Sequence, residues 1–336
     1  MRYIITLAFA STPAFAEVPG VVTDIPPVHA LVAEVMGDLG QPVLLLGRGA
    51  DEHDFALRPS QAIAVAEAGL VVWIGPELTP WLDSALENRP EGAAALALLG
   101  AEGTVLRNYG ETGKDDHAGK AHGHDHAATT AAEGHDHAAE GHDHAAEAGA
   151  HADGHGHDHD HGPGDIDPHA WLDPDNGRHW LGLIAAELSR LDPGNAAVYA
   201  ANAEAATARL TALDAEIAAM LAPVQGKPIV TFHDAYGYFG AHYGLNFAGS
   251  IALGDAASPG AQRLAALRAT LESGEVLCIF PEAQHDKDVV LQMADGTGAK
   301  VGGVLDPVGS TLEPGPGAYG ALLQGMARTI ADCVAG

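Results

Sequence analysis

One stretch, residues 117–161, constrains the fold of this chain more than any other because it contains almost no large apolar side chain. Its core repeats the phrase Gly-His-Asp-His-Ala-Ala three times. Without apolar surface to bury, such a segment cannot offset the entropy that is lost when its backbone is ordered. We therefore predict a disordered loop at residues 111–163, inserted into an otherwise folded chain.

The composition of this His-rich tract also predicts metal binding. Neutral imidazole is a common ligand for zinc, copper and nickel, and the interleaved Asp residues add oxygen ligands. The alternative is a solvated low-complexity insert or a tag, but a tag would be a pure histidine run at a terminus, whereas this tract is internal. The candidate accessory ligands are His117, His122, His124, His126, His135, His137, His142, His144, His151, His155, His157, His159 and His161.

The N-terminal residues are typical of a secretory signal. Met1 and Arg2 are followed by an apolar run over residues 3–10 and by Ala14-Phe15-Ala16, which fits an A-x-A cleavage site. The run is too short to span a bilayer, and no later segment offers about 18 uninterrupted apolar residues. We expect residues 1–16 to be a cleaved signal peptide and the mature protein to be periplasmic.

The charge of the chain narrows the classes of partner. The formal net charge is -29 at pH 7, with 45 acidic and 16 basic residues. Such a surface disfavours nucleic acid and anionic membranes, and it is compatible with a soluble protein that attracts cations.

Only two cysteines are present, Cys278 and Cys333. In an exported protein, an even pair favours a disulfide over two buried thiols. This bond would connect the C-terminal helix to a strand of the same lobe.

Outside the tract, short apolar runs alternate with helical patterns. Strands are predicted at residues 21–25, 43–46, 70–74, 228–232, 247–251, 276–280 and 301–305. Helices are predicted at residues 28–39, 59–68, 176–190, 258–273, 287–294 and 318–334. This alternation favours parallel sheets flanked by helices, so we predict an α/β fold with two lobes, residues 17–192 and 223–336.

A single long helix is predicted to join the lobes. Asp192 and Pro193 suit a helix start, and nothing interrupts the pattern before Pro223. A helix of about 28 residues would extend roughly 42 Å. We therefore interpret residues 193–222 as a rigid linking helix, the alternative being an ordinary surface helix within one domain.

Four potential metal ligands occupy similar places in the predicted topology. His53 follows one strand, His169 lies between two prolines, and His233 and Asp306 each follow a strand directly. We place all four at turns facing an interlobe cleft, two per lobe, because ligands bind beyond the carboxyl ends of parallel strands. Three imidazoles and one carboxylate suit a tetrahedral zinc ion.

The remaining polar and aromatic residues receive simpler interpretations. Asp54 or Asp234 could orient the ligating imidazoles as hydrogen-bond acceptors. Structural or surface roles, without a partner pattern, are assigned to His29, His179, His242 and His285. Core or cleft-wall packing is assigned to Trp73, Trp81 and Trp171.

Five segments form a recognisable set of motifs: Glu52-His53-Asp54-Phe55 with the residues up to Ser60, the strand and turn at 71–77, and the segments 167–174, 231–239 and 305–307. These motifs resemble those of the ZnuA-type zinc-binding proteins of bacterial ABC transporters. The resemblance covers nearly all of the predicted mature chain, including the position of the His/Asp insert and the cysteine pair.

This resemblance implies a cluster A-I solute-binding protein with two lobes joined by one long helix. It also implies zinc held by His53, His169 and His233. Manganese-binding relatives typically have Glu at the third of these positions, so His233 favours zinc. The fourth ligand stays open, because family members use the carboxylate matching Asp306, the one matching Glu52, or a water.

We therefore predict a periplasmic receptor that binds Zn²⁺ in the cleft and delivers it to the ABC permease of the inner membrane. Zn²⁺ is then the transported ligand, and the protein is not an enzyme. The tract would bind further zinc weakly and raise its local concentration. A periplasmic zinc chaperone is a further candidate partner, and we expect a monomer.

Two other functions compete with this hypothesis. A metallohydrolase would leave a zinc position open for water, with Glu52 or Glu282 as base, but no H-E-x-x-H signature is present. A zinc buffer or metallochaperone would use the tract as its main store and need no transporter.

Overall fold

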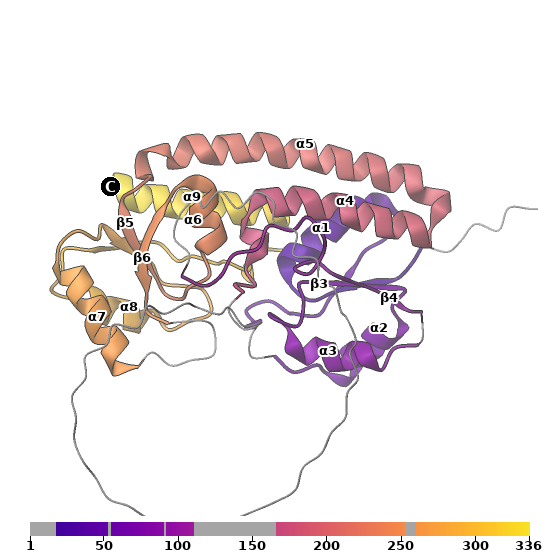
Figure 1. Cartoon of the computed structure of the whole chain (residues 1–336), viewed down its shortest axis with the longest axis horizontal. Coiled ribbons are helices and arrows are strands. Elements are labelled where there is room, and N and C mark those ends of the chain that lie inside the picture. The colour runs from indigo at the N-terminus through magenta and orange to yellow at the C-terminus, as the bar shows by residue number, and fades with distance from the viewer. Residues whose placement is uncertain (1–17, 53–54, 91, 111–165, 253–259) are drawn as a thin grey trace, which may run out of the picture. The chain divides into compact units, whose positions relative to one another are not determined.

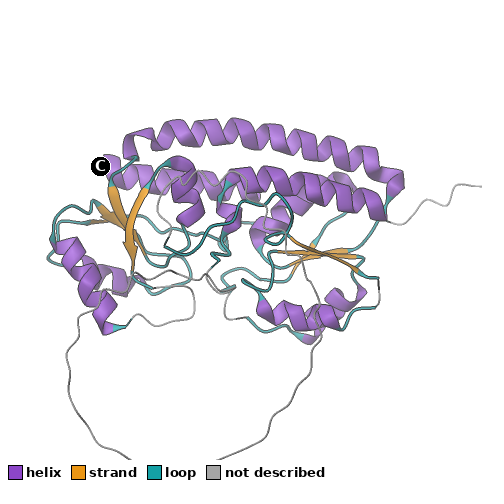
Figure 2. Cartoon of the chain, in the orientation of Figure 1, coloured by secondary structure: helices purple, strands orange, loops and turns teal. Residues whose placement is uncertain are grey.

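The computed structural model describes residues 18–52, 55–90, 92–110, 166–252 and 260–336. The predicted signal peptide, His53, Asp54 and every histidine of the tract lie outside these residues. The described part contains two four-stranded parallel sheets, each flanked by helices (Figures 1 and 2). The predicted α/β fold is therefore confirmed.

The first sheet is built from the N-terminal half of the chain, and its order is β2-β1-β3-β4. Its central strands are short, apolar and buried on both faces, as expected of a parallel sheet covered by helices. The strands are β1 Val21–Thr23, β2 Val43–Leu44, β3 Leu70–Trp73 and β4 Ala94–Ala97. The helices are α1 Pro26–Met36, α2 Pro59–Glu67 and α3 Pro80–Glu87.

The second sheet repeats this topology, in the order β6-β5-β7-β8. In each sheet, the first strand of the lobe lies between its second and third. The strands are β5 Pro228–Thr231, β6 Asn246–Ser250, β7 Cys278–Ile279 and β8 Lys300–Val301. The helices are α6 Gly237–Tyr243, α7 Ala261–Glu272, α8 Lys287–Ala294 and α9 Ala318–Ala335.

The predicted long helix is present as α5, Ala196–Leu221. It starts later than Pro193 because residues Pro193–Asn195 form a 3-10 turn. The Asp192 carboxylate accepts hydrogen bonds from the Asn195 side chain at 2.7 Å and the Tyr199 hydroxyl at 2.9 Å, which fixes the turn onto the helix. Figure 1 shows α5 running alongside α4, Pro174–Leu191, and α9. It therefore packs on helices from both halves of the chain.

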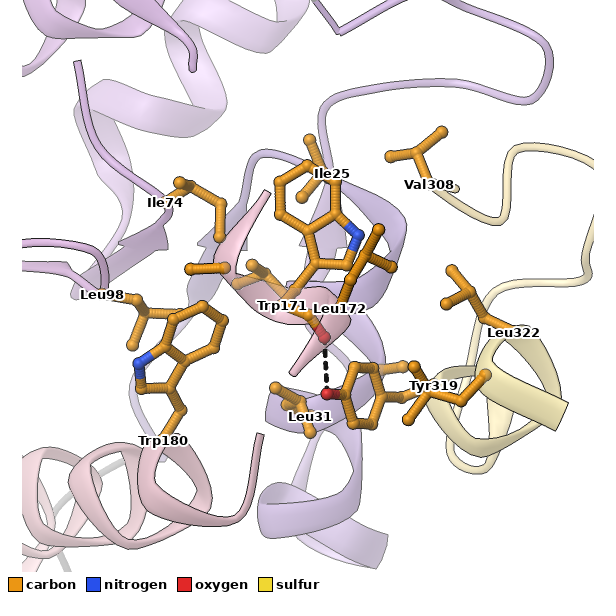
Figure 3. Packing of buried hydrophobic residues seen from close by; sticks show 14 of the residues in the cluster. Ile25, Leu31, Ile74, Leu98, Trp171, Leu172, Trp180, Val308, Tyr319 and Leu322 are labelled. Carbon is orange, nitrogen blue, oxygen red and sulfur yellow. Dashed lines mark hydrogen bonds between the residues drawn. The ribbon is translucent and has the colours of Figure 1, made fainter. Parts of the chain in front are cut away.

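Direct contacts also join the two halves beneath α5. The Trp171 indole donates to the Pro307 carbonyl at 2.8 Å, and the Tyr319 hydroxyl of α9 donates to the Trp171 carbonyl at 2.6 Å. Figure 3 shows Trp171 packed among Ile25, Leu172 and other apolar side chains that come from both halves. One hydrophobic core therefore runs from one lobe into the other.

A carboxylate reinforces this junction. Glu34 of α1 accepts a hydrogen bond from the Gly317 amide at the start of α9, at 2.8 Å, and pairs with Arg209 of α5. An anion at a helix N-terminus satisfies an orphan N–H group and interacts favourably with the helix dipole. Three helices from both halves of the chain thus meet at one side chain.

The predicted disulfide between Cys278 and Cys333 is present and connects β7 to α9. It therefore joins a strand next to the centre of the second sheet to the last helix. Among the described residues, no helix combines the length and apolar character needed to cross a membrane.

Candidate metal centre

Two predicted ligands from different parts of the chain meet in the structure. His233 follows β5, and His169 precedes the 3-10 turn Ala170–Leu172. Both are buried, and their Nε2 atoms lie 3.5 Å apart. Two imidazoles on one tetrahedral zinc ion would have their nitrogens about 3.3 Å apart, given Zn–N bonds of about 2.0 Å. The pair is therefore spaced to bind a single ion.

Each imidazole is oriented by a carboxylate on its other nitrogen. His169 Nδ1 lies 2.6 Å from Asp167 Oδ1, and His233 Nδ1 is bonded to Glu282 Oε2. A proton on Nδ1 makes both bonds possible and leaves Nε2 unprotonated, which is the form that binds a metal. The two Nε2 atoms that face each other are therefore the ones available as ligands.

The carboxylates are themselves held in place. Asp167 Oδ1 also accepts from the His169 amide at 2.9 Å. Glu282 Oε1 accepts from the Tyr236 hydroxyl at 3.0 Å and from the His233 amide at 3.2 Å. The acceptors against the rings are therefore Asp167 and Glu282, whereas the sequence pointed to Asp54, which lies outside the described residues, or Asp234.

The position of Glu282 in the sequence carries the same signal as that of His233. Glu282 follows β7 just as His233 follows β5, and these two strands are neighbours in the second sheet. The rule that placed His233 therefore also brings Glu282 to the same edge. His169 does not fit that rule, because it begins a 3-10 turn and follows no strand of either sheet.

Glu52 lies close to the histidine pair. Its side chain is buried, and this burial raises the pKa of the Glu52 carboxyl to about 7, against the opposing attraction of His169 and His233. The Trp81 indole donates to the Glu52 carbonyl at 3.1 Å, and the Trp81 and Phe55 rings lie 4.9 Å apart. Trp81 therefore holds the chain on both sides of residues 53–54, a larger role than the packing predicted for it.

Asp306 is already engaged by the turn that follows it. Its Oδ1 accepts from the Ser310 amide at 2.9 Å. Its Oδ2 accepts from the Thr311 amide at 2.8 Å and the Thr311 hydroxyl at 2.6 Å. Burial raises the pKa of Tyr236, and the charges of Glu282, Asp306 and Glu52 raise it further, so Asp306 lies near Tyr236.

His285, for which a structural or surface role is predicted, lies beside the centre. Its ring stacks on Phe232 with centroids 4.2 Å apart. Its Nε2 lies 3.8 Å from Glu282 Oε2. His233, Glu282 and His285 form a group whose ligand atoms all lie within 4.8 Å of one another.

His242 also has partners that the sequence did not reveal. Its Nδ1 lies 3.1 Å from Asp173 Oδ1 and its Nε2 lies 2.9 Å from Asp214 Oδ1. Burial lowers the pKa of His242, but the hydrogen bonds and charges of Asp173 and Asp214 outweigh this effect and raise it. The bridge connects α6 to the start of α4 and to α5.

The two other described histidines bond to backbone carbonyls. His29 Nε2 lies 3.1 Å from the Pro42 oxygen, and burial lowers the pKa of His29. His179 Nε2 lies 2.8 Å from the Glu102 oxygen. Both contacts agree with the structural roles predicted for these residues.

Comparisons with known proteins show the family of the chain. The chain matches the family model for ZnuA, zinc-uptake complex component A periplasmic, over residues 21–333. It is 49% identical to the high-affinity zinc uptake system protein ZnuA of Paracoccus denitrificans, over 98% of this chain and 95% of that protein. It is 38% identical to the ZnuA protein of Brucella abortus, over 97% of this chain and 95% of that protein.

Solved structures share the fold. A ZnuA deletion mutant with zinc bound superposes with a TM-score of 0.68 at 23% identity, covering 94% of this chain and 97% of that one. The periplasmic zinc-binding protein TroA of Treponema pallidum gives 0.70 at 18% identity, covering 94% and 99%. The family match over nearly the whole sequence, together with these relatives, shows that the chain belongs to the ZnuA family of periplasmic zinc-uptake components.

Proposed function

We propose that this protein is the periplasmic zinc-binding receptor of an ABC-type zinc importer, which binds Zn²⁺ and delivers it to the membrane permease. The observation that carries the proposal is the buried pair His169 and His233, with Nε2 atoms 3.5 Å apart and each Nδ1 held by a carboxylate. Members of the ZnuA family are transport receptors and not enzymes.

The proposed ligands are His53, His169 and His233, with one further ligand. Glu52 is the favoured carboxylate because it is buried next to His169 and His233. Asp306 is less favoured, since each of its oxygens already accepts two hydrogen bonds, from the amide and hydroxyl of Ser310 and from the amide and hydroxyl of Thr311, which occupies both lone pairs. A water remains the third candidate for this position.

The chemistry of capture follows from the protonation states of these groups. Zinc binds neutral imidazole and ionised carboxylate, so its binding displaces protons. With its pKa raised to about 7, the Glu52 carboxyl holds a proton in part of the metal-free molecules at neutral pH, and zinc binding would release it.

The remaining assignments concern export and partners. The family is periplasmic, and residues 1–16 are proposed as the cleavable signal that leads there. The histidines of residues 117–161 are proposed as an accessory low-affinity zinc store that raises the zinc concentration near the tight site. We also propose that a periplasmic zinc chaperone is a second partner and that the receptor is a monomer.

Isothermal calorimetry with Zn²⁺ tests this function. The mature chain from Glu17 onward and a variant lacking residues 117–161 should both show one tight site. Several weak sites should appear only in the form that keeps the tract. Loss of the tight site together with the tract would exclude the proposed centre at His169 and His233.

A further inference from the structure

His285 is placed differently from the two buried histidines. Its side chain is 24% exposed, whereas that of His169 is 0% and that of His233 is 4% exposed. The stack on Phe232, with an interplanar angle of 12°, fixes the plane of its ring. An ion that arrives from solvent can therefore reach His285 more easily than either member of the buried pair.

The position of its Nε2 atom suits metal coordination. The atom lies 3.8 Å from Glu282 Oε2, which is too long for a hydrogen bond. Two ligands of one zinc ion lie about 3 to 4 Å apart, given bonds of about 2.0 to 2.2 Å. His285 and Glu282 can thus hold one ion between them after little adjustment.

We propose that His285 and Glu282 form a transient zinc position through which the ion passes to and from the tight site. This inference rests on the proposed zinc-binding function. The ion at this position would keep water as its other ligands, because His285 is partly exposed to solvent. Binding there would be weaker than in the tight site, which adds further imidazoles.

The transfer is a ligand exchange at Zn²⁺. The hydrated ion first exchanges two waters for His285 Nε2 and Glu282 Oε2. Its bonds to His285 Nε2 and Glu282 Oε2 then break as bonds to His233 Nε2 and His169 Nε2 form, and the remaining waters return to solvent as the other ligands of the tight site bind. No electron is transferred, and the charge on Glu282 stays the same.

Glu282 can take part without releasing His233. A carboxylate oxygen has two lone pairs, so Oε2 can accept the Nδ1–H of His233 and still bind the ion. Since His233, Glu282 and His285 offer ligand atoms within 4.8 Å of one another, the ion needs to move only a short distance to reach the His233 ring.

The test is the substitution His285→Phe, which keeps a ring to stack on Phe232 but removes the ligand. Zinc uptake and release would be followed by rapid mixing with a chromophoric chelator. Loss of the transient position should raise the activation barrier for zinc transfer and so slow both uptake and release by about tenfold. The Kd should stay within about twofold of the parent value. His179→Gln, which removes an imidazole outside this cluster, should change neither rate.

Two outcomes overturn the inference. Unchanged rates would show that His285 only packs against Phe232. A Kd raised about 100-fold with an unchanged uptake rate would make His285 a permanent ligand of the tight site. Failure of the parent protein to bind zinc tightly would instead exclude the proposed function itself, so the two failures are distinguishable.

A second measurement isolates the transient position. In a His169→Ala variant the tight site is damaged, whereas His285 and Glu282 remain. Calorimetry on a form that also lacks residues 117–161 should then detect one weak zinc site, and adding His285→Phe should abolish it. Persistence of that weak site in the double variant would also overturn the inference.

Discussion

The two sheets have the same strand order, yet the residues that follow corresponding strands have different side-chain chemistry. Asp24 follows β1 and is fully buried, and its carboxylate accepts hydrogen bonds from the amides of Ile25 at 2.8 Å and Ile74 at 2.9 Å. His233 follows β5, the equivalent strand; its Nδ1 is bonded to the Glu282 carboxylate, and its Nε2 lies 3.5 Å from the Nε2 of His169. The topology thus places a polar residue after the first strand of each sheet. The hydrogen bonds of its side chain decide whether that residue holds the backbone, as Asp24 does, or faces a ligand, as we propose for His233.

The largest effect should come from removing one of the facing imidazoles. His169→Ala or His233→Ala should raise the Kd for zinc by more than about 100-fold, since loss of a direct ligand should exceed loss of a group that orients one. Competition with a chelator of known affinity measures this change, and His179→Ala is the control. An unchanged Kd for either variant would remove that residue from the ligand set.

The orienting carboxylates should have the next largest effect. Glu282→Gln and Asp167→Asn should each raise the Kd for zinc by about 10 to 100-fold, because the amide no longer fixes the tautomer of the ring.

The Kd of the Asp306→Asn variant for zinc, measured by the same chelator competition, provides the comparison for these variants. If its carboxylate serves only the following turn, the Kd should change by less than about threefold. A loss as large as that of Glu282→Gln would assign Asp306 to the metal.

Asp24→Asn should act on stability and not on zinc. Burial raises the pKa of Asp24 to about 6, so the folded state binds the proton more tightly than the unfolded state does. The parent protein should therefore lose stability as the pH rises from about 4 through about 6, whereas the variant has no such titration.

Thermal melts of metal-free protein measure this difference. The Tm of the Asp24→Asn variant relative to the parent should increase by roughly a few degrees between pH 4.5 and 7.5. A difference that does not depend on pH would show that Asp24 has no raised pKa. The zinc affinity of the folded variant should match that of the parent.

The smallest effect is expected from the bridge at His242. The folded-state pKa of His242 is raised, because the hydrogen bonds and charges of Asp173 and Asp214 outweigh burial. Its stabilising contribution is therefore complete below about pH 6.5 and is lost as the pH rises through the raised value. His242→Gln should lower the Tm at pH 6 and have little effect at pH 9. An equal loss at both values would mean that His242 contributes by packing alone.

Much of the fold was predictable because its signals are local. Short apolar runs predicted seven of the eight strands in the described part of the chain, and the long helical pattern between Asn195 and Pro223 predicted α5. The strand β4 was missed because its sequence, Ala-Ala-Leu-Ala, has little β propensity and is held by pairing with β3. The cysteine pairing followed from there being only two cysteines.

The metal centre was less predictable because its partners come from distant parts of the chain. The sequence identified His169 and His233 but not the carboxylates that orient them. It also missed His285, because a helix-flanking histidine has no local mark of its neighbours. Asp306 stays a predicted ligand from its place after a predicted strand, and the sequence did not reveal the hydrogen bonds that it accepts from Ser310 and Thr311.

The junction at Glu34 restricts how this receptor can release its cargo. Separating the lobes would strip the start of α9 and Arg209 of α5 from the same carboxylate, and would break the Tyr319 bond to Trp171. A large rigid-body opening would also expose the apolar core that the two halves share, so small loop displacements cost less free energy. At the membrane, zinc should then lose its protein ligands one after another, without a hinge-like separation of the lobes.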